Sequence, residues 1–198
     1  MSVETLTSEA EVFTANVYFV DGVVPTLIDA GAMPGIEKTI ESVDAVVITH
    51  QHGDHIQELD AVVDAFSPRV YAYEDNPHRT NALDDGDSLQ IGDESFEVIH
   101  TPGHADDHIA LLSETTLFSG DVVVYNDGAF DDGSFGRTDL PGQSRETLIT
   151  SIEQILDRLG PSVENLYAGH GDVFHGDVQA VIERALERAE RREPKYPE

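Results

Sequence analysis

The sequence predicts an α+β sandwich, from three observations on its apolar segments. Strand-like runs come in groups with helices interspersed, which fits this class better than strict alternation of strand and helix. Two long stretches have helical periodicity, and several short apolar runs end beside a glycine. The 198 residues suit one compact domain, and no repeat, linker or composition shift marks a boundary. We therefore expect a single domain over residues 1–198.

The first third of the chain has the pattern of strands joined by turns. A β-rich stretch covers 13–20, Asp21-Gly22 forms a turn, and a strand follows at 25–28. A short helix is predicted over 34–42, because Pro34 suits a first helical turn. The apolar run at 45–48 has the character of a buried strand.

The rest of the chain continues with the same kinds of element. The expected segments are a helix at 59–66, strands at 69–73, 96–99, 109–112, 116–119 and 163–168, and helices at 144–159 and 178–192. The helix at 144–159 carries one apolar stripe at helical spacing and is ended by Gly160-Pro161. Asp177 is the expected N-cap of the last helix.

The net charge of the chain says more about the salt conditions that suit the protein than about the reaction it catalyses. There are 11 Lys and Arg against 39 Asp and Glu, a net charge of −28 spread along the whole chain. Such a surface repels itself in dilute buffer and is screened by strong salt, as in proteins of extreme halophiles. It disfavours a nucleic-acid partner. With no Cys, no membrane-spanning run and no signal sequence, we expect a cytoplasmic, high-salt protein without thiol chemistry.

Four metal-ligand residue types, His50, His52, Asp54 and His55, stand within six residues directly after an apolar strand. In extended chain His50 and His52 point to the same side, and the other two follow in the turn to the next helix. Imidazole and carboxylate groups suit zinc and similar divalent ions. Because four ligands this close in sequence do not all reach one ion, the spacing favours two neighbouring ions completed by ligands from elsewhere.

Three more candidates each follow an apolar strand and a glycine: His104, Asp121 and His170. Glycine there lets the backbone turn tightly, so that a ligand can project into a cleft. Taken singly, each of the three fits an ordinary core, surface or turn position, so their assignment depends on the cluster at 50–55.

Together these segments resemble the metallo-β-lactamase superfamily, over nearly the whole chain. Its His-x-His-x-Asp-His signature is matched at 50–55, and its first motif, an Asp after an apolar strand, at Asp29. The resemblance implies a four-layer αββα sandwich with a dinuclear site at one edge. It places His50, His52 and His104 on the first ion, Asp54, His55 and His170 on the second, and Asp121 between them. Asp29 would orient a ligand and tune its basicity.

The resemblance also implies a reaction. Two divalent ions, zinc above iron or manganese, would hold a hydroxide that attacks a thioester carbonyl, with the Asp54 carboxylate orienting it as catalytic residue. Asp121 disfavours antibiotic hydrolysis, since many true β-lactamases of the fold have Cys there or lack this Asp. The segment 135–142, Phe-Gly-Arg-Thr-Asp-Leu-Pro-Gly, resembles that of single-domain glyoxalase II-type (hydroxyacylglutathione hydrolase-like) thioesterases.

Other activities of the superfamily stay open. Mononuclear iron persulfide dioxygenases carry a similar Gly-Arg-Thr-Asp, normally after a Cys that this chain lacks. A lactonase would use the same hydroxide. Residues 101–108 resemble a motif of lactamase-beta-2-like proteins, some of which cut RNA, although the net charge disfavours this. The expected partner is a small thioester or ester, with no nucleic acid or membrane; the thiol carrier, native metal and oligomeric state stay open.

Three residues are candidates for substrate contact: Tyr125, Arg137 and His108. Each also has a structural interpretation. Tyr125 would pack, His108 would bond a neighbour, and Arg137 would pair with Asp139 or Asp132, which is the favoured alternative for Arg137. No role is assigned to the remaining histidines outside the ligand set, which are His78, His100 and His175.

Overall fold

The computed structural model describes residues 2–191. The chain divides into two compact units, Met1–Phe96 and Glu97–Glu198. Each unit has its own cluster of buried apolar side chains. Whether the two behave as one domain in solution stays a prediction.

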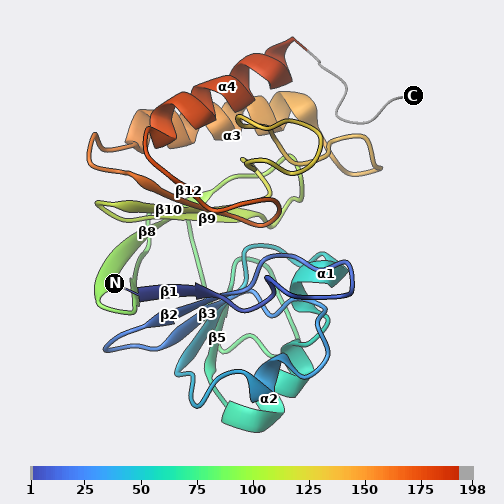
Figure 1. The fold of residues 1–198 in the computed structure, drawn as a ribbon, viewed down its shortest axis with the longest axis vertical. Helices are drawn as coiled ribbons and strands as arrows, with labels where there is room; N and C mark the ends of the chain where they lie inside the picture. The colour runs from blue at the N-terminus through green and yellow to red at the C-terminus, as the bar shows by residue number, and fades with distance from the viewer. Residues whose placement is uncertain (1, 192–198) are drawn as a thin grey trace. The chain divides into compact units, whose positions relative to one another are not determined.

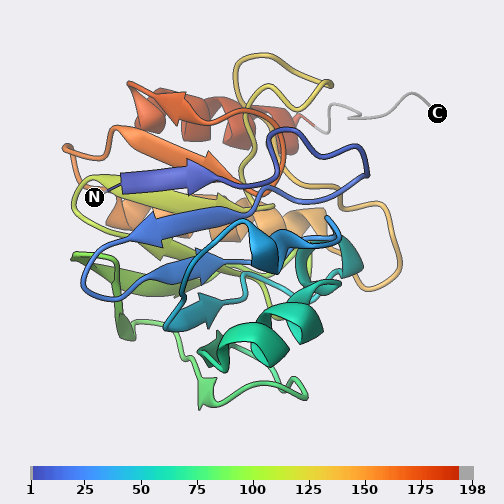
Figure 2. The ribbon, with the colours of Figure 1, turned by 60° about the horizontal axis from the view of Figure 1, so that its bottom comes forward.

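The first unit is built on a mixed six-stranded sheet whose spatial order follows the chain. Its strands are β1 (Ser2–Thr5), β2 (Tyr18–Asp21), β3 (Thr26–Ile28), β4 (Ala45–Val47), β5 (Arg69–Ala72) and β6 (Asn81–Ala82). The first three pair antiparallel, and β3 to β6 pair parallel. In Figure 2 the colours therefore run from blue towards green across this sheet.

Short helices connect these strands: η1 (Ile36–Lys38), α1 (Gly53–Ile56) and α2 (Leu59–Phe66). The helix predicted over 34–42 is wrong in extent, because only one 3₁₀ turn forms. Gly35 has a left-handed φ of 86°, and the Thr39 hydroxyl donates to the Ile36 carbonyl at 2.7 Å, which closes the turn. Where a turn was predicted after His52, the chain forms the single helical turn α1.

The second sheet is also mixed and has the order β12-β11-β10-β9-β8-β7. Its strands are β7 (Ser88–Ile91), β8 (Glu94–His100), β9 (Ile109–Leu112), β10 (Thr116–Gly120), β11 (Asn165–Ala168) and β12 (Phe174–His175). Strands β8 to β10 pair antiparallel, β10 and β11 pair parallel, and β12 returns antiparallel.

Two long helices, α3 (Arg145–Arg158) and α4 (Val178–Glu190), lie side by side on one face of the strands of the second unit (Figure 1). Their apolar stripes bury Leu148 and Ile152 from α3 and Ile182 from α4 against the strands. Ser144 and Asp177 cap them, each accepting a backbone N–H of the first turn. The predicted cap at Asp177 is confirmed; the predicted helix end at 192 lies outside the described residues.

Two mixed sheets with flanking helices agree with the predicted fold class. The strands that sequence patterns missed are β1, β6, β7 and β12, which are two to four residues long and carry exposed polar side chains. Within residues 2–191, no helix has the length and apolar character that crossing a membrane requires.

Candidate metal centre

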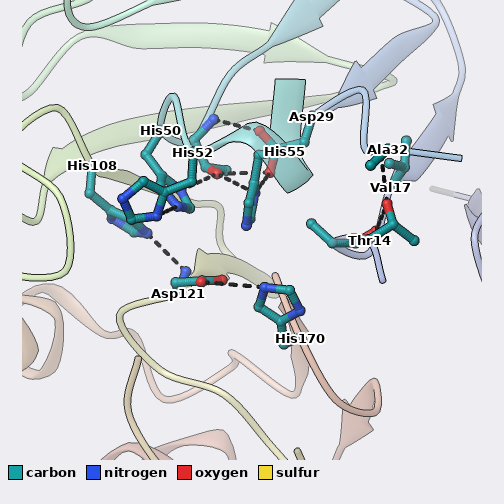
Figure 3. Close-up of polar contacts among 12 residues, drawn as sticks. Thr14, Val17, Asp29, Ala32, His50, His52, His55, His108, Asp121 and His170 are labelled. Carbon is teal, nitrogen blue, oxygen red and sulfur yellow. Dashed lines mark hydrogen bonds and ion pairs between the residues drawn. The ribbon is translucent and has the colours of Figure 1, made fainter. Parts of the chain in front are cut away.

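The first group of candidate metal ligands, or donor group, lies within residues 50–55 after β4. A buried hydrogen-bond network around Asp29 holds it (Figure 3). One carboxylate oxygen of Asp29 accepts the backbone N–H of Thr49 at 2.8 Å. The other accepts the Thr49 hydroxyl at 2.8 Å and lies 2.7 Å from Nδ1 of His55. Asp29 itself has a φ of 62°, which lies in the left-handed region of backbone conformation.

This network decides which ring nitrogen His50 and His55 each offer to a metal ion. Because a carboxylate only accepts, Nδ1 of His55 carries the proton and its Nε2 keeps a lone pair. The Thr49 hydroxyl gives its proton to Asp29, so it can accept from Nδ1 of His50 at 3.2 Å. Nε2 of His50 is then also left with a lone pair, as a metal ligand requires.

The backbone of α1 is tied to neighbouring loops. The His55 carbonyl accepts from the N–H groups of Ala30 and Gly31, both at 2.8 Å. The Asp54 carbonyl accepts from Ala15 at 3.1 Å, and the Thr14 side chain accepts the N–H of Ala32 at 2.7 Å (Figure 3). The segment that carries Asp54 and His55 is therefore held from two sides within the first unit.

The second group of donors comes from three loops of the second unit. His104 follows β8, Asp121 follows β10 and His170 follows β11. One carboxylate oxygen of Asp121 lies 3.3 Å from Nε2 of His104 and 3.5 Å from Nε2 of His170 (Figure 3 draws the second contact). A single oxygen is thus placed between two imidazoles.

The irregular segment around Gly136 fixes the ring of His104. Nδ1 of His104 lies 2.9 Å from the carbonyl oxygen of Arg137, which can only accept, so Nδ1 is protonated. A Cβ at Gly136 would lie 2.0 Å from the Asp121 carbonyl and 2.9 Å from Nδ1 of His104. Glycine is therefore required for the chain to pass this close to both residues.

The donor pairs within each unit fit a divalent ion. Two ligands bound to a tetrahedral zinc at 2.0–2.1 Å lie about 3.3 Å apart. Nε2 of His50 and Nδ1 of His52 are 3.0 Å apart, and the Asp121 contacts are 3.3 and 3.5 Å. In a neutral His104 the lone pair of Nε2 faces a carboxylate lone pair, and a cation bound to both removes that repulsion.

The candidate substrate residues have structural contacts. The Tyr125 ring packs on Phe174 with centroids 4.7 Å apart. Arg137 makes a two-pronged ion pair with Asp139, at 2.9 and 2.8 Å, and this pair lowers the pKa of the Asp139 carboxyl. The pair with Asp139, one of the two partners that the sequence indicated for Arg137, is the one that forms.

The other acidic partner considered for Arg137 pairs with α4. Asp132 bonds Arg188 at 2.7 Å, which lowers the pKa of Asp132. The histidines without assigned roles bond locally: His78 to Asp60, His100 to the Asp106 carbonyl and His175 to Asn165. Sequence reasoning missed Thr49, Gly136 and Arg188, although the position of Thr49 directly before His50 was a usable signal.

His108 is fully buried and bonded on both sides of its ring. Its Nε2 accepts the backbone N–H of Asp121 at 2.9 Å, and its Nδ1 lies 2.7 Å from the Thr101 hydroxyl. Of the two alternatives that the sequence left for His108, the bond to neighbours is the one that the structure contains.

Comparisons with known proteins agree with this picture. A model described as the metallo-beta-lactamase superfamily matches residues 10–87 and 69–196. A probable metallo-hydrolase of Streptococcus pyogenes serotype M6 is 31% identical over 185 residues, covering 78% of this chain and 77% of that protein. A hydroxyacylglutathione hydrolase of Francisella philomiragia is 39% identical over 93 residues, 44% of this chain and 37% of that protein.

The chain thus aligns with little more than a third of that hydroxyacylglutathione hydrolase. Among solved structures, TTHA1623 in a di-iron-bound form matches with a TM-score of 0.66 and 26% identity, over 83% of this chain and 94% of that one. This structural match confirms the fold class that the sequence predicted.

Proposed function

Because the chain belongs to the metallo-beta-lactamase superfamily, we propose that it is a dinuclear metal-dependent hydrolase that cleaves thioesters. The observation that carries the proposal is the Asp121 carboxylate oxygen placed between the Nε2 atoms of His104 and His170. A carboxylate shared in this way suits a ligand that bridges two ions, and a bridged pair of ions is suited to hydrolysis.

The ligand assignment that the superfamily resemblance implies completes the proposal. His50, His52 and His104 would hold one ion, Asp54, His55 and His170 the other, and Asp121 both. When bound, the ions supply an activated water at neutral pH and polarise the carbonyl of the substrate. The di-iron form of a solved relative supports a two-ion site with this fold and leaves zinc, iron and manganese as candidates.

The protein's own groups would prepare this chemistry. Asp29 and Thr49 keep Nε2 of His50 and His55 unprotonated, so that neither ligand must lose a proton to bind. The Asp54 carboxylate would accept a hydrogen bond from the attacking water and so aim it at the carbonyl. A thiolate is a good leaving group, so the mechanism needs no dedicated protein acid. This is why a thioester is favoured over an amide.

The choice of thioesters has its own support. The 39% identity with a hydroxyacylglutathione hydrolase favours this substrate class over lactones and β-lactams, although the aligned part is 37% of that relative. The longer match to a probable metallo-hydrolase supports the hydrolase class alone. The thiol part of the substrate is left open. Arg137, the candidate for binding a substrate carboxylate, is paired with Asp139.

The test is hydrolysis of simple thioesters in molar salt by zinc-loaded wild-type protein and by Asp54→Asn. We expect the variant to lose at least about 100-fold in kcat, in line with the loss of a group that positions the attacking water. Asp64→Asn, on an exposed position of α2, is the matched control and should keep wild-type kcat. Near-normal turnover by Asp54→Asn would contradict the mechanism, and absence of thioester cleavage by the wild type would contradict the substrate class.

A further inference from the structure

His108 lies beside the backbone of Asp121, in a position that the proposed ligand set does not use (Figure 3). Its side chain is fully buried, and Nε2 accepts the N–H of Asp121 at 2.9 Å. A backbone N–H only donates, so Nε2 must be unprotonated. The proton of the neutral ring is therefore on Nδ1.

Thr101 holds His108 in this tautomer. Its hydroxyl lies 2.7 Å from Nδ1 of His108 and can accept the Nδ1 proton. The Thr101 N–H also donates to the carbonyl of His108 at 2.8 Å, where β8 and β9 meet. Asp121, His108 and Thr101 thus form a buried chain of hydrogen bonds that donates in one direction, from the N–H of Asp121 after β10 to the Thr101 hydroxyl at the end of β8.

The acceptor of the Asp121 N–H affects the position of this residue, because Asp121 directly follows the end of β10. Gly120 turns the chain with a left-handed φ of 50°, and Asp121 is buried directly after it. A buried N–H without an acceptor is unfavourable, so the acceptor of the Asp121 N–H helps to fix the position of this loop. The N–H of Asp121 belongs to the same residue whose carboxylate reaches His104 and His170, and a rotation of this backbone would move that oxygen.

We propose that His108 is a positioning residue: through the backbone N–H of Asp121 it fixes the carboxylate that bridges the two ions. The inference rests on the proposed role of Asp121 as a shared ligand. It gives Thr101 the supporting task of keeping the His108 proton on Nδ1. It also removes His108 from the substrate-contacting group, because Nε2 faces the backbone of Asp121.

Two replacements of His108 separate this role from simple packing. A glutamine places its carbonyl oxygen near the site of Nε2 and can still accept from Asp121. An asparagine reaches only the site of Nδ1 and keeps the contact with Thr101. Both remove ring volume, so a purely structural role predicts comparable losses in both, whereas the positioning role predicts that only His108→Gln preserves the bridging carboxylate.

The measurement is the affinity for Zn²⁺ alone, by competition with a chromogenic chelator, with thermal unfolding of the metal-free proteins as a control. His108→Asn should bind zinc about 10–100-fold more weakly than the wild type, the range typical of groups that orient a ligand. His108→Gln should stay within about threefold of the wild type, while the unfolding temperatures of both variants fall together. Equal zinc affinities for the two variants would overturn the proposal.

A second pair of variants, at Thr101, tests the proposal if the His108 variants do not fold. Thr101→Val removes the acceptor of the Nδ1 proton, whereas Thr101→Ser keeps the hydroxyl. Zinc binding should weaken in the valine variant and recover in the serine variant; wild-type affinity in Thr101→Val would also contradict the proposal. Because these readouts need no substrate, a failure of the thioester assay leaves them interpretable, and a failure here leaves the hydrolase proposal standing.

Discussion

The two donor groups use the same residue types but are held in different ways. In the first unit, all the donors lie within 50–55, and side chains orient them: Asp29 and Thr49 set the protons of His50 and His55. In the second unit, the candidate metal ligands come from three loops, and hydrogen bonds that involve the main chain orient two of them. The carbonyl of Arg137 sets the proton of His104, and the N–H of Asp121 meets His108.

The loops of the second unit are held close to one another by the main chain. The Gly169 N–H donates to the Gly120 carbonyl at 2.7 Å, which joins the loops of Asp121 and His170. A Cβ at Gly171 would lie 2.0 Å from the Tyr125 carbonyl, so these loops touch backbone to backbone. Metal binding by the first group should therefore be sensitive to substitutions that change side-chain hydrogen bonds. Metal binding by the second group should be sensitive to substitutions that add atoms next to the main chain.

The largest effect is expected from Gly136→Ala. Its Cβ would lie 2.0 Å from the Asp121 carbonyl, so the main chain must move. We expect the free energy of unfolding to fall by about 2–4 kcal/mol, as for other overpacked sites, and zinc binding to be lost. Denaturant unfolding and zinc titration measure both. Gly142→Ala, whose Cβ meets nothing within 4 Å although φ is 89°, is the milder control. Equal losses of stability and zinc binding in both variants would show that the close approach of Gly136 to the Asp121 carbonyl has no special role.

Asp29→Asn should have the next largest effect, mainly on metal binding. Asparagine tolerates the left-handed φ of 62° and can still accept from the Thr49 N–H. Its amide nitrogen would face the protonated Nδ1 of His55, donor against donor, and favour the tautomer with the proton on Nε2. Zinc affinity should fall about 10–100-fold.

Long-range ¹H–¹⁵N spectra of the histidine rings report this tautomer directly. The signals of His55 should change while those of His104 keep the pattern of a ring protonated on Nδ1. An unchanged His55 tautomer in Asp29→Asn would show that Asp29 does not control it.

The smallest effect is expected from Arg188→Ala. Arg188 bonds Asp132 at 2.7 Å and the Gly133 carbonyl, and its guanidinium carbon lies 4.1 Å from the centroid of the Phe130 ring. It thereby holds the loop that leads to Gly136. Loss of these contacts should cost about 1–2 kcal/mol. Arg188→Lys, which keeps the charge but not the planar fork, should recover part of this.

The Arg188 effect should also depend on pH. The Arg188 hydrogen bond lowers the pKa of Asp132 from its ordinary 3.8. A lowered folded-state pKa stabilises the protein above the ordinary value and ceases to do so as the pH falls through the lowered value. The difference in unfolding temperature between wild type and Arg188→Ala should therefore shrink as the pH falls from about 5 to about 2. A constant difference would show that the ion pair contributes nothing.

Sequence alone predicted the residues of the first donor group better than the contacts that hold the second donor group in place. A run of ligands at 50–55 after an apolar strand is visible locally, because strand periodicity alone places His50 and His52 on one side. The helices at 145–158 and 178–190 were predicted closely for the same reason, since their apolar stripes are local signals.

The parts that sequence did not predict depend on contacts between distant segments. Gly136 is needed only because its main chain passes the Asp121 carbonyl, and Arg188 acts on a loop more than 50 residues earlier in the chain. The predicted helix at 34–42 was wrong because Gly35 and Thr39 close a single turn there. None of these effects has a periodic signature, so only the folded chain reveals them.

A dinuclear site is tested most directly by the metal content of the wild-type protein, purified in molar salt without added metal and measured by elemental analysis. We expect about two divalent ions per chain, of zinc or of a zinc mixture with iron or manganese, and about one or fewer in Asp121→Ala. One iron per wild-type chain with little zinc would contradict it. That result, together with oxygen uptake on a thiol persulfide, would replace hydrolysis by persulfide oxidation.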